Sequence, residues 1–341
     1  MKRQSRNLSR REFLERGLQG AGICALGGAA LKSQAAGSDS KNPLAYDMDR
    51  FAPVDPKLIK YHSIGSFRVV DPEPRRIAVG PGNQLFIASR NGVQIVDPKG
   101  NLVGSVSMGS PARCVAVAED GTIYTGQRTR VDVFSAKGQP LASWESPTRK
   151  TWLTGLTVGP NDVFAADSAN KVVYRYDRSG KMLGRIGEKN KERSVPGLIV
   201  PSPYLDVKVG TDGLLRINNP GRHTVEVFTP AGDLEFSWGK PSAAIAGFCG
   251  CCNPVGLALL TDGRCITCEK GLPRVKVFST DRELECVIAG PDLFLENGRA
   301  GLNSDSSDGT VGGLDAAVDS HGDVYILDLV ASAVHVMSPN V

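Results

Sequence analysis

Several kinds of catalytic machinery are missing from this sequence of 341 residues. It contains four histidines, too few and too scattered for a histidine-based zinc hydrolase or a nucleophile–histidine triad. It has no phosphate-binding loop and no nucleophile motif. The polar stretch NSDSSDG at 303–309 lacks the alternating carboxylates and the closing glutamate of an EF-hand calcium loop. These absences argue against the commonest hydrolase, phosphotransfer and calcium-sensor chemistries.

The chain also lacks a charge excess of one sign once its first residues are set aside. The formal net charge is +4, but residues 1–35 hold seven Lys/Arg and two Glu. The remainder has 33 basic and 34 acidic side chains and no basic stripe, so we expect no nucleic-acid partner. Outside the N-terminal segment, no apolar run reaches the roughly 20 residues of a membrane-spanning helix. We therefore expect no membrane span in the mature chain.

The first residues have the order of an export signal. The run SRREFL (9–14) precedes a short Gly/Ala-rich apolar stretch (17–31) and the small residues Ser-Gln-Ala (33–35). This pattern resembles a twin-arginine signal, the kind that exports folded proteins. The resemblance implies a signal peptide over 1–35, cleavage after Ala35 and a periplasmic or other extracytoplasmic location.

The rest of the sequence is a six-fold repeat. Each unit has an apolar strand, a Gly/Asn turn, a second strand, a polar break and a third strand, as in LTGLTVGPNDVFAADSANKVVYRYDRSG (153–180). A fourth apolar strand follows most units. Four short antiparallel strands at this period are typical of a propeller blade. The turns recur at intervals of 38 to 59 residues, at Asn83, Gly121, Asn161, Gly213, Gly263 and Gly322.

The last unit stops after its third strand. The missing strand is supplied by residues 57–69, which would close the ring by pairing both chain ends. We therefore predict an all-β, six-bladed β-propeller over 57–341, preceded by a linker at 36–56, and expect a monomer. The units resemble NHL repeats, most clearly at 162–180 and 323–338, although Asn219 and Glu269 stand where that family prefers Asp.

The extra length is concentrated in the loops that join one blade to the next, at 188–204, 240–254 and 290–313. These loops share a face, here called the top face, with the turns after each second strand, and insertions on one face often mark the binding face. Polar residues at those turns would ring the channel mouth, or would simply hydrogen bond the turns that follow them. The candidate mouth residues are Arg128, Asp167, Asn219, His223, Glu269 and Asp328.

Six of the eight cysteines lie between 249 and 286, in or beside the fifth blade. The loop cysteines Cys249, Cys251 and Cys252 and the strand end Cys268 can converge on one rim. Cys265 has the opposite parity, so it should lie deeper, between blades. Cys286 falls on the outer fourth strand and Cys114 in an apolar strand elsewhere.

Three interpretations of these cysteines stay open. Thiolates at 249, 251, 252, 265 and 268 suit an iron–sulfur cluster or zinc, although C-x-C-C is not a ferredoxin run. Disulfides suit an oxidising compartment, and adjacent Cys251 and Cys252 would then take different partners. A redox dithiol formed by Cys265 and Cys268 is the third, although this pair is not at the start of a helix.

The pattern favours an exported propeller that acts as a binding or scaffold module, not as an enzyme. We predict that its cysteine-rich top face holds a metal or iron–sulfur centre for electron transfer to a periplasmic protein or redox partner. One alternative is a divalent-cation-dependent hydrolase or lyase at the channel mouth. Another is an interaction propeller stapled by disulfides. Fold alone does not choose between them.

Overall fold

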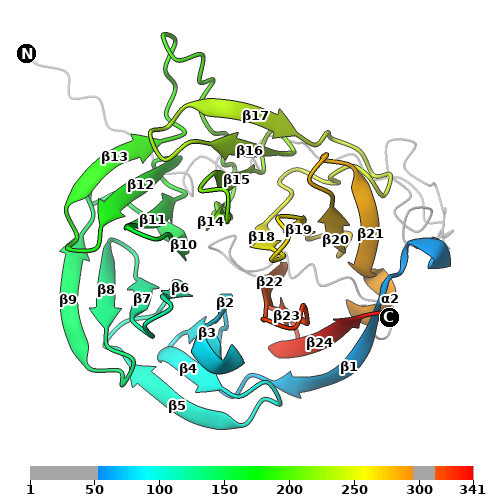
Figure 1. Cartoon of the computed structure of the whole chain (residues 1–341), viewed down its shortest axis with the longest axis horizontal. Coiled ribbons are helices and arrows are strands. Elements are labelled where there is room, and N and C mark those ends of the chain that lie inside the picture. The colour runs from blue at the N-terminus through cyan, green and yellow to red at the C-terminus, as the bar shows by residue number, and fades with distance from the viewer. Residues whose placement is uncertain (1–52, 295–311, 341) are drawn as a thin grey trace, which may run out of the picture. The chain divides into compact units, whose positions relative to one another are not determined.

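The computed structural model of the protein describes residues 53–294 and 312–340. The predicted signal, most of the predicted linker and the NSDSSDG stretch lie outside the described residues. Six four-stranded antiparallel sheets stand around a central axis as the blades of a propeller (Figure 1). The predicted fold class is therefore confirmed. Within the described part of the chain, no helix is long and apolar enough to cross a membrane.

Each blade runs from an inner to an outer strand. The first three blades are β2(Arg76–Val79), β3(Leu85–Ser89), β4(Gly92–Val96), β5(Leu102–Ser107); β6(Cys114–Val117), β7(Ile123–Gly126), β8(Arg130–Phe134), β9(Pro140–Glu145); and β10(Leu153–Val158), β11(Asp162–Asp167), β12(Val172–Asp177), β13(Met182–Ile186). The others are β14(Val207–Val209), β15(Leu215–Asn219), β16(Thr224–Phe228), β17(Leu234–Trp238); β18(Gly256–Leu259), β19(Cys265–Cys268), β20(Val275–Phe278), β21(Leu284–Ala289); and β22(Leu314–Val318), β23(Val324–Asp328), β24(Ala333–Pro339) with β1(Tyr61–Arg68). Short helices are η2(Pro56–Leu58), η3(Pro81–Asn83) and α2(Pro291–Phe294).

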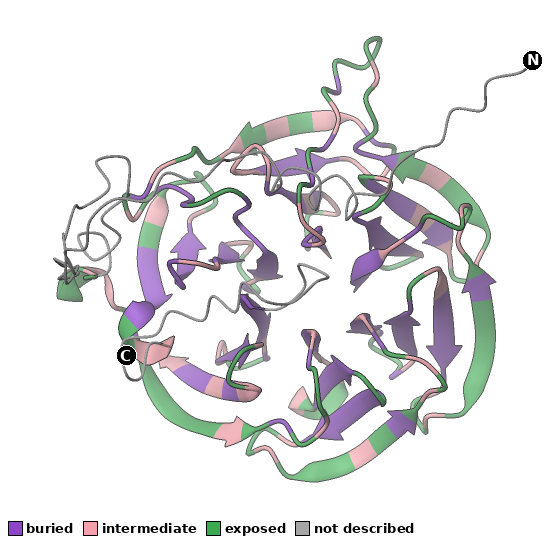
Figure 2. Cartoon of the chain, turned by 180° about the vertical axis from the view of Figure 1, so that it is seen from behind, coloured by how far each residue is buried: buried purple, intermediate pink, exposed green. Residues whose placement is uncertain are grey.

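The strands form where apolar and β-branched residues recur between turns that favour glycine or asparagine. Two of these turns show the conformation directly, because Asn83 and Gly263 have φ angles of 59° and 89°, in the left-handed region. The two middle strands of each blade are buried on both faces between neighbouring blades (Figure 2). The outer strands β5, β9 and β13 are mostly exposed, so the core lies between the blades.

The ring is closed by both ends of the chain. Strand β1 pairs antiparallel with β24 from Tyr61 opposite Pro339 to Arg68 opposite Ala333 (Figure 1). The N-terminal strand therefore supplies the missing outer strand of the last blade, as predicted. The segment before it continues over blade five, where Ile59 bridges to Val287 and Lys60 N donates to the Val287 carbonyl. This cover explains why Cys286 is buried although it lies on an outer strand.

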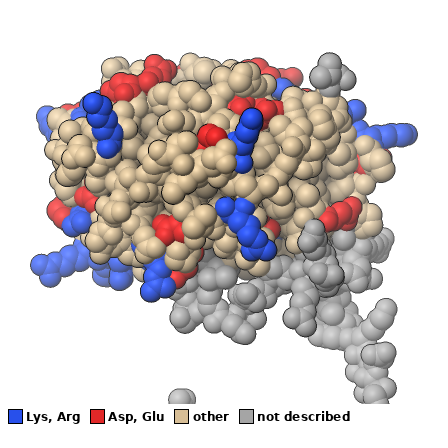
Figure 3. Space-filling view, turned by 90° about the horizontal axis from the view of Figure 1, so that it is seen from below, with Lys and Arg blue, Asp and Glu red and all other residues tan. Residues whose placement is uncertain are grey.

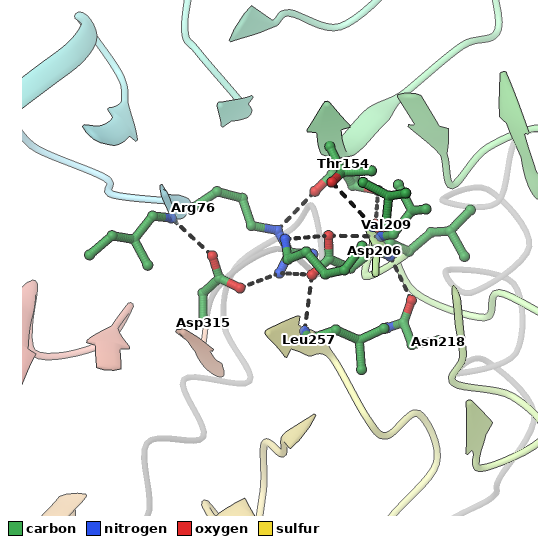
Figure 4. A network of polar contacts seen from close by, with 12 residues as sticks. Arg76, Thr154, Asp206, Val209, Asn218, Leu257 and Asp315 are labelled. Carbon is green, nitrogen blue, oxygen red and sulfur yellow. Dashed lines mark hydrogen bonds and ion pairs between the residues drawn. The ribbon is translucent and has the colours of Figure 1, made fainter. Parts of the chain in front are cut away.

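A buried ionic network crosses the axis of the ring (Figure 4). Arg76 Nη1 lies 2.9 Å from Asp315 Oδ1 and 3.6 Å from Asp206 Oδ2, and its Nε donates to the Thr154 carbonyl at 2.8 Å. Each carboxylate also accepts from a backbone amide of the next blade around the ring, Asp315 from Ile77 N and Asp206 from Leu257 N. The network thus joins blades one, three, four, five and six.

The carboxylates of the network have opposite pKa shifts. Burial raises the pKa of Asp315, and Arg76 offsets this only in part. Burial would also raise the pKa of Asp206, but Lys208 and Arg76 more than offset it and hold the pKa below its ordinary value. Lys208, at 3.2 Å, and Arg76, at 3.6 Å, therefore keep the carboxylate of Asp206 charged at the axis.

We expect Arg76→Met to lower the free energy of unfolding by about 3–5 kcal/mol, because it leaves buried carboxylates without their main partner. Urea denaturation measures this. The matched control is Arg264→Met, which removes a partly exposed arginine paired with Asp262 and Glu285 and should cost about 1 kcal/mol or less. Equal losses in the two variants would contradict a central role for the network.

Candidate functional site

The cysteine loop, residues 239–255, joins β17 to β18 on the top face. A parallel bridge between Pro241 and Phe248 closes its base. The Phe248 ring packs against Trp238 of blade four and Phe278 of blade five, with ring centroids 6.2 and 5.8 Å away. This aromatic contact roots the loop between two blades.

Three charged side chains lie buried beneath the loop. Glu269, Arg274 and Lys276, here called the charge cluster, all have fully buried side chains. Glu269 Oε2 accepts from Arg274 Nη2 at 2.8 Å, and Glu269 Oε1 lies 2.7 Å from Lys276 Nζ. One carboxylate therefore faces two cations. Burial lowers the pKa of Lys276 to about 8, although Glu269 opposes the shift.

The remaining polar atoms of the cluster bind the loop backbone. Lys276 Nζ donates to the carbonyls of Gly247 at 2.6 Å and Ile245 at 3.0 Å. Arg274 Nη1 donates to the Ala243 carbonyl at 3.0 Å, and Glu269 Oε2 accepts from Cys249 N at 3.1 Å. Carbonyl oxygens thus complete the solvation of the extra cation, and the cluster holds the loop in one conformation.

Hydrogen bonds of the Asn253 side chain hold the other end of the cysteine run. Asn253 Nδ2 donates to the carbonyls of Cys249 at 2.6 Å and Lys270 at 2.9 Å, while Asn253 Oδ1 accepts from Lys270 N at 2.9 Å. His223 Nε2 lies 2.7 Å from the Gly250 carbonyl. The Asn253 side chain therefore ties the loop to the turn after β19.

The structure separates the cysteines that the sequence analysis grouped. Cys268 is fully buried in the core with Leu314 and Ile326 of blade six. The prediction that Cys268 reaches the rim is therefore wrong. Its side chain points between blades five and six because it lies on the face of β19 opposite to Cys265. Cys265 packs with Val225 and Leu257, which confirms its predicted place between blades.

Within the loop the cysteines differ in exposure. Cys249 is buried against Ala243 and Leu272, Cys252 is buried and Cys251 is exposed. The Sγ atoms of Cys251 and Cys252 are 3.3 Å apart, although the disulfide interpretation gave them different partners. All seven cysteines of the described residues are free thiols. Burial raises the pKa of Cys265 to about 12 and that of Cys286 to about 11.

A ligand set for a metal is not formed by these side chains. Within residues 53–294 and 312–340, no group of three or more His, Cys, Asp or Glu side chains is placed to bind a metal ion. Cys265 and Cys268 face different interblade cores, away from the loop. The iron–sulfur or zinc centre stays a prediction of the cysteine pattern.

The candidate mouth residues divide into two groups. Asp167, Asn219 and Glu269 are fully buried and directed into loop and turn hydrogen bonds, so they do not ring the mouth. Asp167 Oδ1 accepts from Ala169 N and Asn170 N, which confirms the turn-binding interpretation. Asn219 Oδ1 accepts from Ile199 N, 20 residues away, and so ties down the preceding interblade loop instead.

Of the other candidates, Arg128 and His223 lie nearer the surface, whereas Asp328 is buried. The Arg128 guanidinium lies over the Trp152 ring, 4.8 Å from its centroid, with Arg113 at 3.9 Å from the same ring. Asp328 caps the turn after β23 by accepting from Val330 N and Ala331 N. It also lines, with Lys270, Phe67, Phe294 and His335, a pocket of about 510 Å³ between blades five and six.

Sequence reasoning missed the charge cluster apart from Glu269. A signal was present, because each third strand carries a polar or ionisable residue near its centre, with apolar neighbours on both sides except at Tyr174, which precedes Arg175. These residues are Gln94, Asp132, Tyr174, Glu226, Lys276 and His335. Such a position points into the blade interface, where a polar group needs a partner. Asp132 contacts Gln127, Tyr174 contacts Asp167 and Glu226 contacts Asn219, each partner lying at the top end of the second strand. In blade five that partner is Glu269.

No protein-family model matches the chain, and no curated protein matches it. Among solved structures, it is similar to a streptogramin B lyase, with 17% identity over 82% of this chain and 98% of that chain and a TM-score of 0.56. A virginiamycin B lyase from Staphylococcus aureus has 14% identity over 82% and 99% and a TM-score of 0.55. A protein of unknown function from Bacteroides thetaiotaomicron has 16% identity over 82% and 75% and a TM-score of 0.57. At these identities the likeness shows the propeller fold alone.

We expect Glu269→Gln to lower the free energy of unfolding by about 3–5 kcal/mol, because it leaves two buried cations facing a neutral amide. The matched control is Glu226→Gln at another buried glutamate. Burial raises the pKa of Glu226, so a neutral side chain there should cost less. Urea denaturation under reducing conditions compares them. Equal costs would contradict the assignment of Glu269 as the anion that the cluster requires.

The depressed pKa of Lys276 makes stability depend on pH. Between about pH 8 and 10.5 the unfolded state binds a proton that the folded state has lost, so this group adds stability as pH rises. From pH 7 to 9.5 we expect the wild type to gain about 1–2 kcal/mol relative to Lys276→Met. Urea denaturation of both proteins at each pH tests this. A difference that stays constant or falls would contradict the prediction.

Proposed function

We propose that this chain is an exported interaction module whose top face binds an acidic surface of a partner protein. The observation that carries the proposal is the segregation of charge between the two faces of the ring. The chain after residue 35 has almost balanced charge, so a cationic face must be matched by an anionic one. Such asymmetry favours and orients the approach of an oppositely charged partner.

The loops of the top face carry the cations. In their described parts Lys and Arg outnumber Asp and Glu, even with the buried residues included. The basic residues are Arg75, Arg90, Arg113, Arg128, Arg149, Lys150, Lys171, Lys189, Lys191, Arg222, Lys240, Lys270 and Arg274. Arg193 belongs to the same loops but is not counted, because its Nε donates at 2.7 Å to Asp233 on a turn of the opposite face. The acidic residues are Asp71, Glu73, Glu188, Glu192, Asp206, Glu269 and Asp292.

The turns of the opposite face have the reverse balance. Their basic residues are Lys99, Lys137, Arg178, Lys181, Arg264 and Arg282. Their acidic residues are Asp97, Glu119, Asp120, Asp212, Asp233, Asp262, Asp281, Glu283, Asp319 and Asp323. On the side of the ring shown in Figure 3, both signs are interspersed. Positive and negative charges are therefore separated between the top face and the opposite face, and not around the side of the ring.

Aromatic rings position several of the top-face cations. Trp152 lies beneath Arg113 and Arg128, and Lys270 Nζ lies 4.1 Å from the centroid of the Tyr204 ring. Cation–π contacts of this kind reduce the side-chain freedom that binding would otherwise remove. Around the mouth the face thus offers partly ordered cations beside aromatic surface, which suits a protein partner.

The contacts of the described residues do not favour the alternative of a hydrolase or lyase with a divalent cation at the channel mouth. The carboxylates that would hold a divalent cation, Asp167 and Glu269, are occupied in buried hydrogen bonds. The cavity at the mouth above Arg76 measures about 30 Å³, far below the roughly 300 Å³ at which small-molecule sites begin. Twin-arginine export and a metal centre for electron transfer stay predictions of the sequence.

Binding of a fluorescein-labelled peptide rich in Asp and Glu, followed by fluorescence anisotropy, tests the proposal. We expect affinity to fall at least tenfold between 20 and 300 mM salt, because surface charges are screened within about 10 Å at 0.1 M salt. The triple variant Arg128→Glu, Arg149→Glu and Lys171→Glu should lose at least tenfold in affinity at low salt.

The matched control reverses three lysines on the opposite face, Lys99→Glu, Lys137→Glu and Lys181→Glu, and has the same change in net charge. It should bind the peptide within about threefold of wild type. Equal losses in the two triple variants would overturn the assignment to the top face. Tighter binding of a single-stranded oligonucleotide than of the peptide would overturn the class of partner.

A further inference from the structure

Cys251 and Cys252 bring their sulfur atoms together although they are neighbours in the sequence. The two Sγ atoms are 3.3 Å apart. In an extended chain adjacent side chains point to opposite sides, so this placement needs a turn. Gly250 precedes the pair with a φ of 81°, in the left-handed region that favours glycine. A disulfide has its sulfurs about 2.05 Å apart, so bond formation needs about 1.3 Å of approach.

The two thiols differ in access. Cys251 is exposed and can be reached by another molecule, whereas Cys252 is 3% exposed. Cys251 is the only exposed thiol among the described cysteines, because the other six are buried. An external oxidant that reacts with the folded protein therefore meets Cys251 first, and Cys252 stands directly behind it.

The loop is built to hold this pair in place. Asn253 follows Cys252 and is bound on both sides, to Cys249 and to the backbone of Lys270. Upstream, Cys249 N donates to the buried Glu269. The cysteine pair thus lies between two anchored residues. Rigid support on both sides is what a reactive pair needs and an ordinary surface loop lacks.

The charge around the pair favours a thiolate at Cys252. Burial raises the pKa of Cys252, but contacts with Ser202, Cys251 and the Lys270 ammonium outweigh it, so the pKa lies below the ordinary value. The hydrogen bond to Cys252 raises the pKa of Cys251, and burial adds to that rise. With Cys252 as the thiolate, the S–H of Cys251 donates to the sulfur of Cys252 across the 3.3 Å between them.

We propose that Cys251 and Cys252 are a redox-active vicinal dithiol that exchanges two electrons with disulfide substrates. Adjacent α-carbons are about 3.8 Å apart, below the usual range of about 4.4–6.8 Å for disulfides. A bond between neighbours is consequently strained and easily reduced, which suits a reactive pair better than a structural staple. This inference does not depend on the partner proposed above.

The exchange proceeds in two balanced steps. Cys251 first passes its proton to the Cys252 thiolate and then, as a thiolate, attacks one sulfur of the substrate R–S–S–R, which forms the mixed disulfide Cys251–S–S–R and releases R–S⁻. The released R–S⁻ takes the proton from Cys252 and leaves as R–SH. The Cys252 thiolate then attacks Cys251 Sγ, forms the Cys251–Cys252 bond and expels R–S⁻. The two cysteines lose two electrons, and the substrate disulfide gains them.

Thiol trapping and mass spectrometry of the folded, reduced mature chain test the proposal. Glutathione disulfide and the disulfide form of thioredoxin serve as separate oxidants, so that their rates distinguish small from protein disulfides. We expect a loss of two hydrogens confined to the peptide that carries the loop, and its reversal by reduced glutathione. Cys251→Ala and Cys252→Ala should each abolish this intramolecular bond, and Cys252→Ala should stop at the mixed disulfide.

The matched control is Cys249→Ala, which removes the third thiol of the same peptide and should oxidise like the wild type. Loss of the intramolecular bond in Cys249→Ala would overturn the vicinal assignment. Wild-type protein that is folded but keeps all its thiols reduced with both oxidants would also overturn it.

Lys270→Met should slow the second step several-fold at pH 7 and approach the wild-type rate at pH 9. No effect of Lys270→Met at either pH would overturn the assigned role of the ammonium.

A measurement on the wild-type protein avoids any question of folding. Phenylarsine oxide bridges two neighbouring thiols, so one equivalent should protect two thiols from a thiol-modifying reagent in the reduced, folded chain. Protection of one thiol or none would overturn the proposal. Prior oxidation with glutathione disulfide should abolish the binding of phenylarsine oxide. Unchanged binding after this oxidation would also overturn the proposal.

Discussion

The ion pairs between Arg76 and the carboxylates of Asp206 and Asp315 are the constraint on which the ring depends. Each blade contributes a short inner strand, and these strands cannot pair with one another across the axis. A buried arginine can reach several of them, because its guanidinium offers five donors in one plane. Backbone carbonyls accept from this guanidinium, and backbone amides donate to the two carboxylates. The blades must therefore pack together for these buried charges to be paired.

The same principle operates farther from the axis in blade five. Lys276 occupies a position that is polar in all six third strands, and its partner Glu269 comes from the top-face turn. The pair alone would be neutral, but Arg274 adds a cation whose hydrogen bonds extend to the loop carbonyls. Burial of excess positive charge is costly unless such oxygens surround it. The cysteine loop is thereby anchored to the blade beneath it.

Anchoring of this kind connects the fold to both proposed activities. A face that carries oriented cations and an anchored thiol pair presents its chemistry at defined positions. The channel contributes little, because Arg76 closes it near the top face. Interaction and thiol chemistry therefore belong to the surface, while the cysteines Cys265 and Cys268 serve the interblade cores.

The sequence by itself determined the blades. Period-two apolar strands, Gly/Asn turns and the incomplete last unit predicted six blades closed by the N-terminal strand, since each feature acts over a few residues or by simple counting. It also predicted the opposite parity of Cys265. Only the tertiary structure decided that Cys268 turns away from the loop, that Cys251 faces Cys252 and that Lys276 meets Glu269. Those outcomes depend on blade twist, loop path and the pairing of buried charges, which join residues far apart in the chain.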